Sequence, residues 1–166
     1  MTAHDPLSPL PSPPTGNTSR RHRALGLPVI ALIGLALLAV PRVVLHDLGL
    51  IQERTFANIV LVFVPPLIWI GVALLRRVRT PFLTLLVVGS FYGLFLAIGH
   101  QLLWDVAWGD TPPTLGGNLA DLDPAVQSAI LRFFAAVSSL FTGVIVGAVA
   151  GLIAWGLGKA TRRTPA

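Results

Sequence analysis

Four long apolar runs constrain what this chain can fold into more than any other feature of its sequence. They occupy residues 24–45, 55–75, 81–104 and 136–158. A helix that rises about 1.5 Å per residue needs about 20 apolar residues to cross the hydrocarbon core of a bilayer. Each run is long enough to do so. We therefore predict an all-α integral membrane protein whose four transmembrane helices lie within residues 24–158.

The composition also favours lipid over water as the solvent of this chain. Only 11% of its 166 residues are charged and 54% are hydrophobic, whereas a soluble domain carries about 25% charged residues. The chain has no cysteine, which excludes disulfides and thiolate chemistry. Its basic residues lie at the ends of the apolar runs and are not interleaved with aromatic residues. No nucleic-acid partner is therefore expected.

The charged residues predict how the helices are oriented. Cytoplasmic ends of membrane helices retain Lys and Arg, and short connections join antiparallel neighbours. We therefore predict an antiparallel up-down-up-down bundle with both termini in the cytoplasm. The compact chain and its charge asymmetry fit a bacterial-type cytoplasmic membrane. The basic residues assigned to the cytoplasmic side are Arg20, Arg21, Arg23, Arg76, Arg77, Arg79, Lys159, Arg162 and Arg163, and those toward the outer side are Arg42, Arg54 and Arg132.

Three segments lie outside the predicted spans. Residues 1–23 are rich in proline and end in basic residues, which predicts a disordered cytoplasmic tail. Residues 105–135 are predicted to form an outer loop that continues into a helical extension of the last span. Residues 159–166 form a short basic tail on the cytoplasmic side.

Small residues and prolines predict local features of the spans. Pro65 and Pro66 lie at the middle of the second run, where they predict a break in the helix. Small residues also recur at about every fourth position of the last two runs, which allows two helix backbones to approach closely. This face serves either packing inside the bundle, which we favour, or a homo-oligomeric contact. Its members are Gly89, Gly93 and Ala97 in the third run, and Ser139, Gly143, Gly147 and Gly151 in the fourth.

Polar side chains gather near the outer ends of the predicted helices. Arg42 follows Arg23 by 19 residues and His100 follows Thr80 by 20, so each lies about one bilayer thickness from the cytoplasmic edge. Helical spacing turns these side chains toward the bundle interior. We predict an outer-face cluster beneath the loop at 105–123. Its members are Arg42, His46, Asp47, His100, Gln101, Asp105 and Arg132.

Four interpretations of this cluster are open. The favoured one is a polar lid in which cations and acids pair and fix the helix ends. A second is a ligand, ion or headgroup site, because two arginines suit a phosphate or carboxylate and histidines titrate near pH 6.5. A third is a zinc site from His46, His100 and either Asp47 or Asp105, although no HxxxH pairing supports it. The fourth is acid–base catalysis by His100 with Asp105, which lie about 140° apart on a helix.

The sequence does not specify one activity. The first expectation is a non-catalytic accessory, assembly or partner-binding membrane protein. The alternatives are a small oligomeric channel or transporter subunit, and a ligand-binding protein or enzyme that uses the outer cluster. A proton-coupled transporter is disfavoured because no charged residue lies at the predicted midplane. The expected partners are the bilayer and either another membrane protein or a second copy of the chain. No metal or cofactor is expected.

Overall fold

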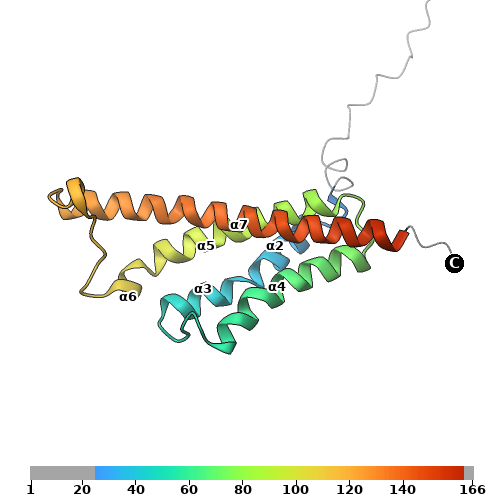
Figure 1. Cartoon of the computed structure of the whole chain (residues 1–166), viewed down its shortest axis with the longest axis horizontal. Helices are drawn as coiled ribbons and strands as arrows, with labels where there is room; N and C mark the ends of the chain where they lie inside the picture. Colours follow the sequence, from blue (N-terminus) through green and yellow to red (C-terminus); the bar gives the residue numbers. More distant parts are fainter. Residues whose placement is uncertain (1–24, 163–166) are drawn as a thin grey trace, which may run out of the picture.

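The computed structural model describes residues 25–162, and every regular element in them is a helix. The predicted tail at 1–23 and the last residues of the basic tail lie outside the described residues. Four stretches are long and apolar enough to cross a membrane, which confirms the prediction of an all-helical chain with four membrane-spanning helices. The elements (Figure 1) are α2 (Val29–Leu37), α3 (Val40–Asp47), α4 (Phe56–Leu75), α5 (Pro81–Leu102), α6 (Trp104–Trp108), the 3₁₀ turn η1 (Gly117–Leu119) and α7 (Pro124–Arg162).

The first span consists of two helices rather than one. α2 ends at Leu37 and α3 begins at Val40, with Pro41 in its first turn. A proline at this position has no N–H for the Leu37 carbonyl, and its ring crowds that carbonyl. The N–H groups of Leu38 and Ala39 bond to carbonyls three residues back instead of four. The continuous helix predicted over 24–45 is therefore corrected to a broken span.

The second span, in contrast, is not interrupted at its prolines. α4 runs continuously from Phe56 to Leu75 with Pro65 and Pro66 inside it. The two rings remove the hydrogen bonds to Leu61 and Val62, but proline holds φ near −65°, a value that a helix also requires. The loss of two hydrogen bonds is not enough to end the helix. A break was predicted at these prolines, but α4 continues through both of them.

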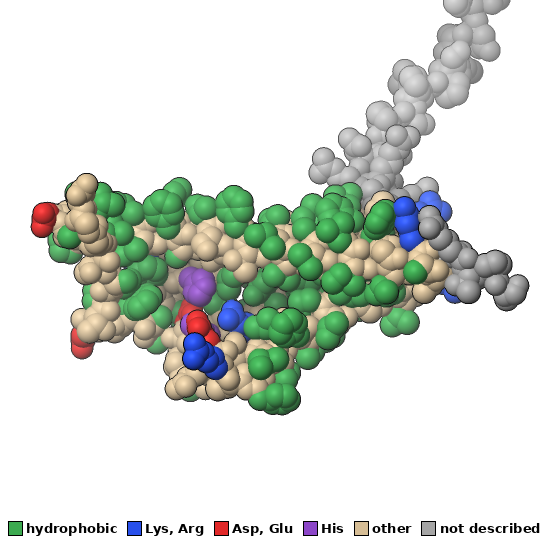
Figure 2. Space-filling view, in the orientation of Figure 1, with side chains coloured by type: hydrophobic (Ala, Val, Ile, Leu, Met, Phe, Trp, Pro, Cys, Tyr) green, Lys and Arg blue, Asp and Glu red, His purple; other side chains and the backbone are tan. Residues whose placement is uncertain are grey.

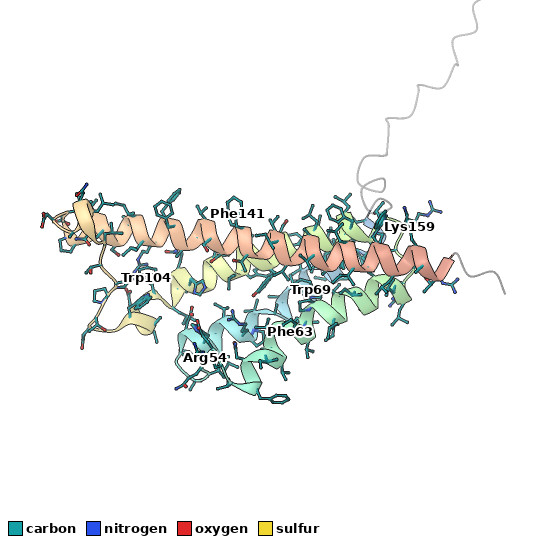
Figure 3. The ribbon with its side chains drawn as sticks, in the orientation of Figure 1. Arg54, Phe63, Trp69, Trp104, Phe141 and Lys159 are labelled. Carbon is teal, nitrogen blue, oxygen red and sulfur yellow. The ribbon has the colours of Figure 1, made fainter. Side chains whose placement is uncertain are left out.

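Trp69 of α4 lies beside the break in the first span. Its side chain is fully buried, and its indole Nε1–H donates a 2.7 Å hydrogen bond to the Leu35 carbonyl of α2. Its ring also meets the Tyr92 ring edge-on at a centroid distance of 6.0 Å. Figure 3 shows Trp69 between the helices, whereas Phe63 and Phe141, both more than half exposed, lie on apolar surfaces of α4 and α7. Trp69 therefore links the irregular first span to α4 and α5.

Replacing Trp69 by phenylalanine should lower the free energy of unfolding by about 1–3 kcal/mol. The change removes the indole donor to Leu35 and part of the buried ring. The midpoint of thermal unfolding in detergent would measure the loss. Trp155→Phe is the matched control, because Trp155 is 46% exposed. An equal loss in both variants would contradict a specific role for Trp69.

The small-residue faces of α5 and α7 pack against each other within this chain. A Cβ added at Gly89 would collide with the Gly143 carbonyl and lie 2.5 Å from Gly147 Cα. A Cβ at Gly147 would lie 2.6 Å from the Leu85 carbonyl oxygen. Ala97 and Ser139 are buried as well. Of the two interpretations of these faces, packing inside the bundle is the one observed, and α5 covers the small residues that a second copy would need.

The last helix is much longer than a membrane is thick. The predicted span at 136–158 and its extension form one uninterrupted helix, α7, of 39 residues, which is about 58 Å long. The hydrocarbon core of a bilayer is about 30 Å thick, so α7 extends beyond it. The predicted basic tail begins as helix, since α7 ends at Arg162. The start of α7 receives the connection from α6, and residues 135–142 further along the helix form one wall of the site described next.

Candidate functional site

A cleft of about 700 Å³ lies between α3 and residues 135–142 of α7. α5 and α6 form its floor, so residues far apart in the sequence meet there. Figure 2 shows histidine, acidic and basic side chains close together beneath α7. Its polar, aromatic and small lining residues are Arg42, His46 and Asp47 from α3, His100 from α5, Trp104 and Trp108 from α6, and Ala135, Ser138, Ser139 and Thr142 from α7.

Asp47 is the centre of the polar wall. Its side chain is only 6% exposed, and its Oδ2 lies 2.6 Å from His100 Nδ1. Its Oδ1 lies 3.3 Å from Nδ1 of the neighbouring His46. A carboxylate accepts hydrogen bonds, so each imidazole that carries its proton on Nδ1 donates to Asp47. This pairing ties the end of α3 to the end of α5.

Arg42 lies one turn before His46 and contacts a different set of residues. Its Nε donates a 3.1 Å hydrogen bond to Asn58 Oδ1 of α4, and its guanidinium lies close to the Tyr92 hydroxyl of α5. Asn58 in turn donates from Nδ2 to the Glu53 carbonyl at 2.6 Å. Within residues 25–162, no carboxylate lies within ion-pair distance of Arg42. Neutral partners therefore hold this cation at the junction of three helices.

The other predicted cluster residues form a separate group. Arg132 of α7 pairs with Asp105 of α6 at 2.9 Å and lies 5.1 Å from the centroid of the Trp104 ring. Gln101 donates from Nε2 to the Arg132 carbonyl at 2.9 Å. None of Gln101, Asp105 and Arg132 lines the cleft. The seven predicted residues therefore divide into an Asp47 group (Arg42, His46, Asp47, His100) and an Arg132 group (Gln101, Asp105, Arg132), on either side of Trp104.

This division corrects several details of the sequence interpretation. His100 pairs with Asp47 instead of Asp105, because α5 ends at Leu102 and Asp105 turns toward α7. The two arginines do not converge, so a two-arginine phosphate site is not supported. Of the predicted loop at 105–123, Val106, Ala107 and Trp108 line the cleft, and residues 109–123 do not. Instead, Gln127 holds that loop against the start of α7 through the backbone of Leu115, Ala120 and Leu122.

Two residues of this region were not among the predicted site residues. Asn58 binds Arg42, and Tyr92 contacts it from α5. The sequence places Asn58 three residues after Thr55, the N-cap residue of α4. The Thr55 side chain accepts a hydrogen bond from the Asn58 N–H there. That position puts Asn58 at the same end of the bundle as Arg42. Tyr92 had no comparable signal beyond being the one tyrosine in the chain.

The arrangement gives no support to a metal centre. In the part of the chain that the structure describes, no group of three His, Cys, Asp or Glu side chains could hold a metal ion. His46 Nδ1 and His100 Nδ1 each face a different oxygen of Asp47, at 3.3 and 2.6 Å, so both nitrogens are directed at this carboxylate. What the Asp47 group does is join α3 to α5, while Arg42 joins α3 to α4. The geometry is that of a polar contact between helices beside an open cleft.

Comparison of this chain with known protein families, curated proteins and solved structures finds no match.

Proposed function

We propose that this is a non-catalytic membrane protein that receives a transmembrane segment of a partner membrane protein in the cleft between α3 and α7. The observation that carries the proposal is the α7 wall of the cleft. It includes Ala135, Ser138 and Thr142, small residues at helical spacing that remain at least partly exposed, whereas the neighbouring Ser139 is buried. In lipid, small residues let a second helix approach closely, and close contact drives association.

The Asp47 group supplies the polar part of this surface. Asp47 is bound by two imidazoles, and Arg42 is bound by Asn58, so these groups are already paired with their own chain. A partner segment with a serine, threonine or amide side chain at this level would add to the network. This pairing favours a contact surface over an acid–base site, in which the reacting group must be free to exchange a proton with substrate.

We also propose the orientation and location predicted from the sequence: spans that alternate in direction, with both termini in the cytoplasm of a bacterial-type cell. The charge distribution supports it. Arg77, Arg79 and Lys159 line one cleft. Figure 2 shows basic side chains at that end of the molecule and acidic side chains toward the other. Basic residues are retained on the cytoplasmic side of a membrane.

A small amphipathic ligand is the second candidate occupant. The cleft volume of about 700 Å³ falls in the range of about 300–1,000 Å³ that is usual for ligand pockets. Trp104 and Trp108 lie beside the Asp47 group, so one site offers both an aromatic and a polar surface. An oligomeric channel has no comparable support, because the small-residue face that it would use is buried against α5.

Site-specific photo-crosslinking in native membranes tests the proposal. A photoreactive phenylalanine analogue replaces Thr142, which is exposed in the cleft, or Phe63, which is exposed on α4 outside it. We expect a discrete protein adduct from position 142 and none from position 63, identified by mass spectrometry. An adduct of low mass at position 142 would favour the ligand instead. Lipid adducts alone, equal at both positions, would contradict both candidates.

A further inference from the structure

A second cleft lies at the opposite end of the molecule from Asp47. It has a volume of about 600 Å³ and lies between the end of α4, the start of α5 and the last turns of α7. Arg77, Arg79 and Lys159 line it, together with the apolar side chains of Leu75 and Trp155. Figure 3 shows Lys159 at this end of α7. We call this site the basic cleft.

The three cations of the basic cleft have no acidic partner in the described chain. Within residues 25–162, every carboxylate lies between Asp47 and Asp123, and none pairs with Arg77, Arg79 or Lys159. Figure 2 shows basic side chains gathered at this end of the molecule. Like charges that face one cleft repel each other unless an anion joins them. The cleft is therefore electrostatically suited to a negatively charged group.

The backbone at Arg77 adds a second observation. Arg77 has φ +48°, the only positive φ of a non-glycine residue in the described chain. It follows the end of α4, where the N–H of Arg77 bonds to Leu74 and that of Val78 bonds to Ala73. This is the capping pattern in which glycine is the usual residue, because side chains strain a left-handed backbone. The chain thus carries a cation where glycine would cost less.

The remaining walls of the basic cleft are apolar. Lys159 Nζ lies 4.0 Å from the centroid of the Trp155 ring, and Trp155 is about half exposed. Tryptophan is enriched where the hydrocarbon of a membrane meets its headgroups. Leu75 is 84% exposed on the neighbouring wall. One cleft therefore presents cations and apolar surface together at the basic end of the transmembrane helices.

We propose that the basic cleft binds an anionic phospholipid through its headgroup phosphate. Arg77 and Arg79 bind the phosphate oxygens, since guanidinium groups match phosphate geometry, and Lys159 adds a third charge. The acyl chains lie along Leu75 and Trp155. Basic clefts between transmembrane helices on the cytoplasmic side suit such headgroups. This inference does not depend on the occupant of the α3–α7 cleft.

The test uses the full chain in nanodiscs of phosphatidylcholine, with or without added phosphatidylglycerol. Thermal unfolding measures stabilisation, and native mass spectrometry measures retained lipid. We expect phosphatidylglycerol to raise the unfolding midpoint, because a ligand that binds only the folded state stabilises it. Each of Arg77→Gln, Arg79→Gln and Lys159→Gln should weaken lipid retention about fivefold, the ratio that corresponds to about 1 kcal/mol per cation. Arg76→Gln is the matched control, since Arg76 is in the same turn but does not line the cleft.

Arg77→Gly separates lipid binding from folding. It relieves the left-handed strain, so in phosphatidylcholine it should unfold at the same temperature as the parent chain or higher, while retaining less phosphatidylglycerol. Equal lipid retention by Arg77→Gly and the parent would overturn the proposal, as would an equal loss in Arg76→Gln. Inorganic phosphate added to phosphatidylcholine nanodiscs should give no shift. A shift as large as that with phosphatidylglycerol would assign the cleft to free phosphate instead.

Discussion

Replacing Gly89 by leucine should abolish the folded state. A Cβ at this position already collides with the Gly143 carbonyl and comes within 2.5 Å of Gly147 Cα. The atoms in the way belong to the backbone of α7, so no side-chain rotation can relieve the contact. Moving the two helices apart would forfeit the packing that holds helices together in lipid. Overpacking against mobile side chains costs about 1–3 kcal/mol, and we expect a larger loss here.

The amount of monodisperse protein after size-exclusion chromatography and the midpoint of thermal unfolding would measure this effect. Gly156→Leu is the matched control, because Gly156 lies on α7, the other helix of this contact, and a Cβ there has open space around it. It should leave both quantities unchanged. If Gly89→Leu instead gave a stable monomer where the parent chain is an oligomer, the glycine face would join copies of the chain, against the packing described above.

The four-residue period of small residues predicted where the close contact would form, but not which helix would make it. A period defines a face on one helix, and a face that packs within the bundle has the same spacing as one that packs between copies. The structure resolves this because α5 carries small residues of its own, Gly89 and Gly93, at the level of Gly143 and Gly147. Matching small-residue faces on two helices of one chain thus allow the close contact to form inside the bundle.

The prolines show where apolar runs do not determine backbone geometry. Pro41 interrupts the first span, whereas Pro65 and Pro66 do not interrupt α4. All three remove a backbone hydrogen bond. The first span differs in having a tertiary contact beside its irregular turn: the Leu35 carbonyl accepts from Trp69 Nε1 as well as from the Leu38 N–H. Hydropathy carries no information about such a contact, which joins residues 34 positions apart.

Counting residues from the basic helix ends predicted the level of the polar side chains in the bundle. The 100° step per residue was less successful in predicting which side chains would pair. Counting from the basic ends put His46, Asp47 and His100 at one level, and Asp47 does contact both histidines. Rotation along a helix could not assign Asp105, because α5 ends at Leu102 and α6 begins a new direction at Trp104. Beyond a helix end, the 100° step no longer relates one side chain to the next.

Removing the Asp47 carboxylate should have the second largest effect on stability. The Asp47 side chain is only 6% exposed. Asp47→Ala therefore leaves the imidazole groups of His46 and His100 without their acceptor in a nearly buried position. Breaking a fully buried ion pair costs about 3–5 kcal/mol. His46 and His100 are about one-third exposed, so water can replace part of the lost contact and we expect about 2 kcal/mol. Unfolding of purified protein in detergent measures the change.

Two further variants of this region separate a structural role of Asp47 from a role in binding. Glu53→Ala is the control: Glu53 is 79% exposed and 3.8 Å from His46, so its loss should change stability by less than about 0.5 kcal/mol.

Asp47→Asn keeps one acceptor oxygen and should restore most of the stability lost in Asp47→Ala. If the asparagine variant is stable and still forms the photo-adduct at position 142, Asp47 acts by joining α3 to α5. If it is stable but forms no adduct, the carboxylate itself contacts the occupant of the cleft. If Asp47→Ala is as stable as the parent chain, the contact between α3 and α5 does not depend on this residue, and the Asp47 group cannot be what fixes the cleft wall.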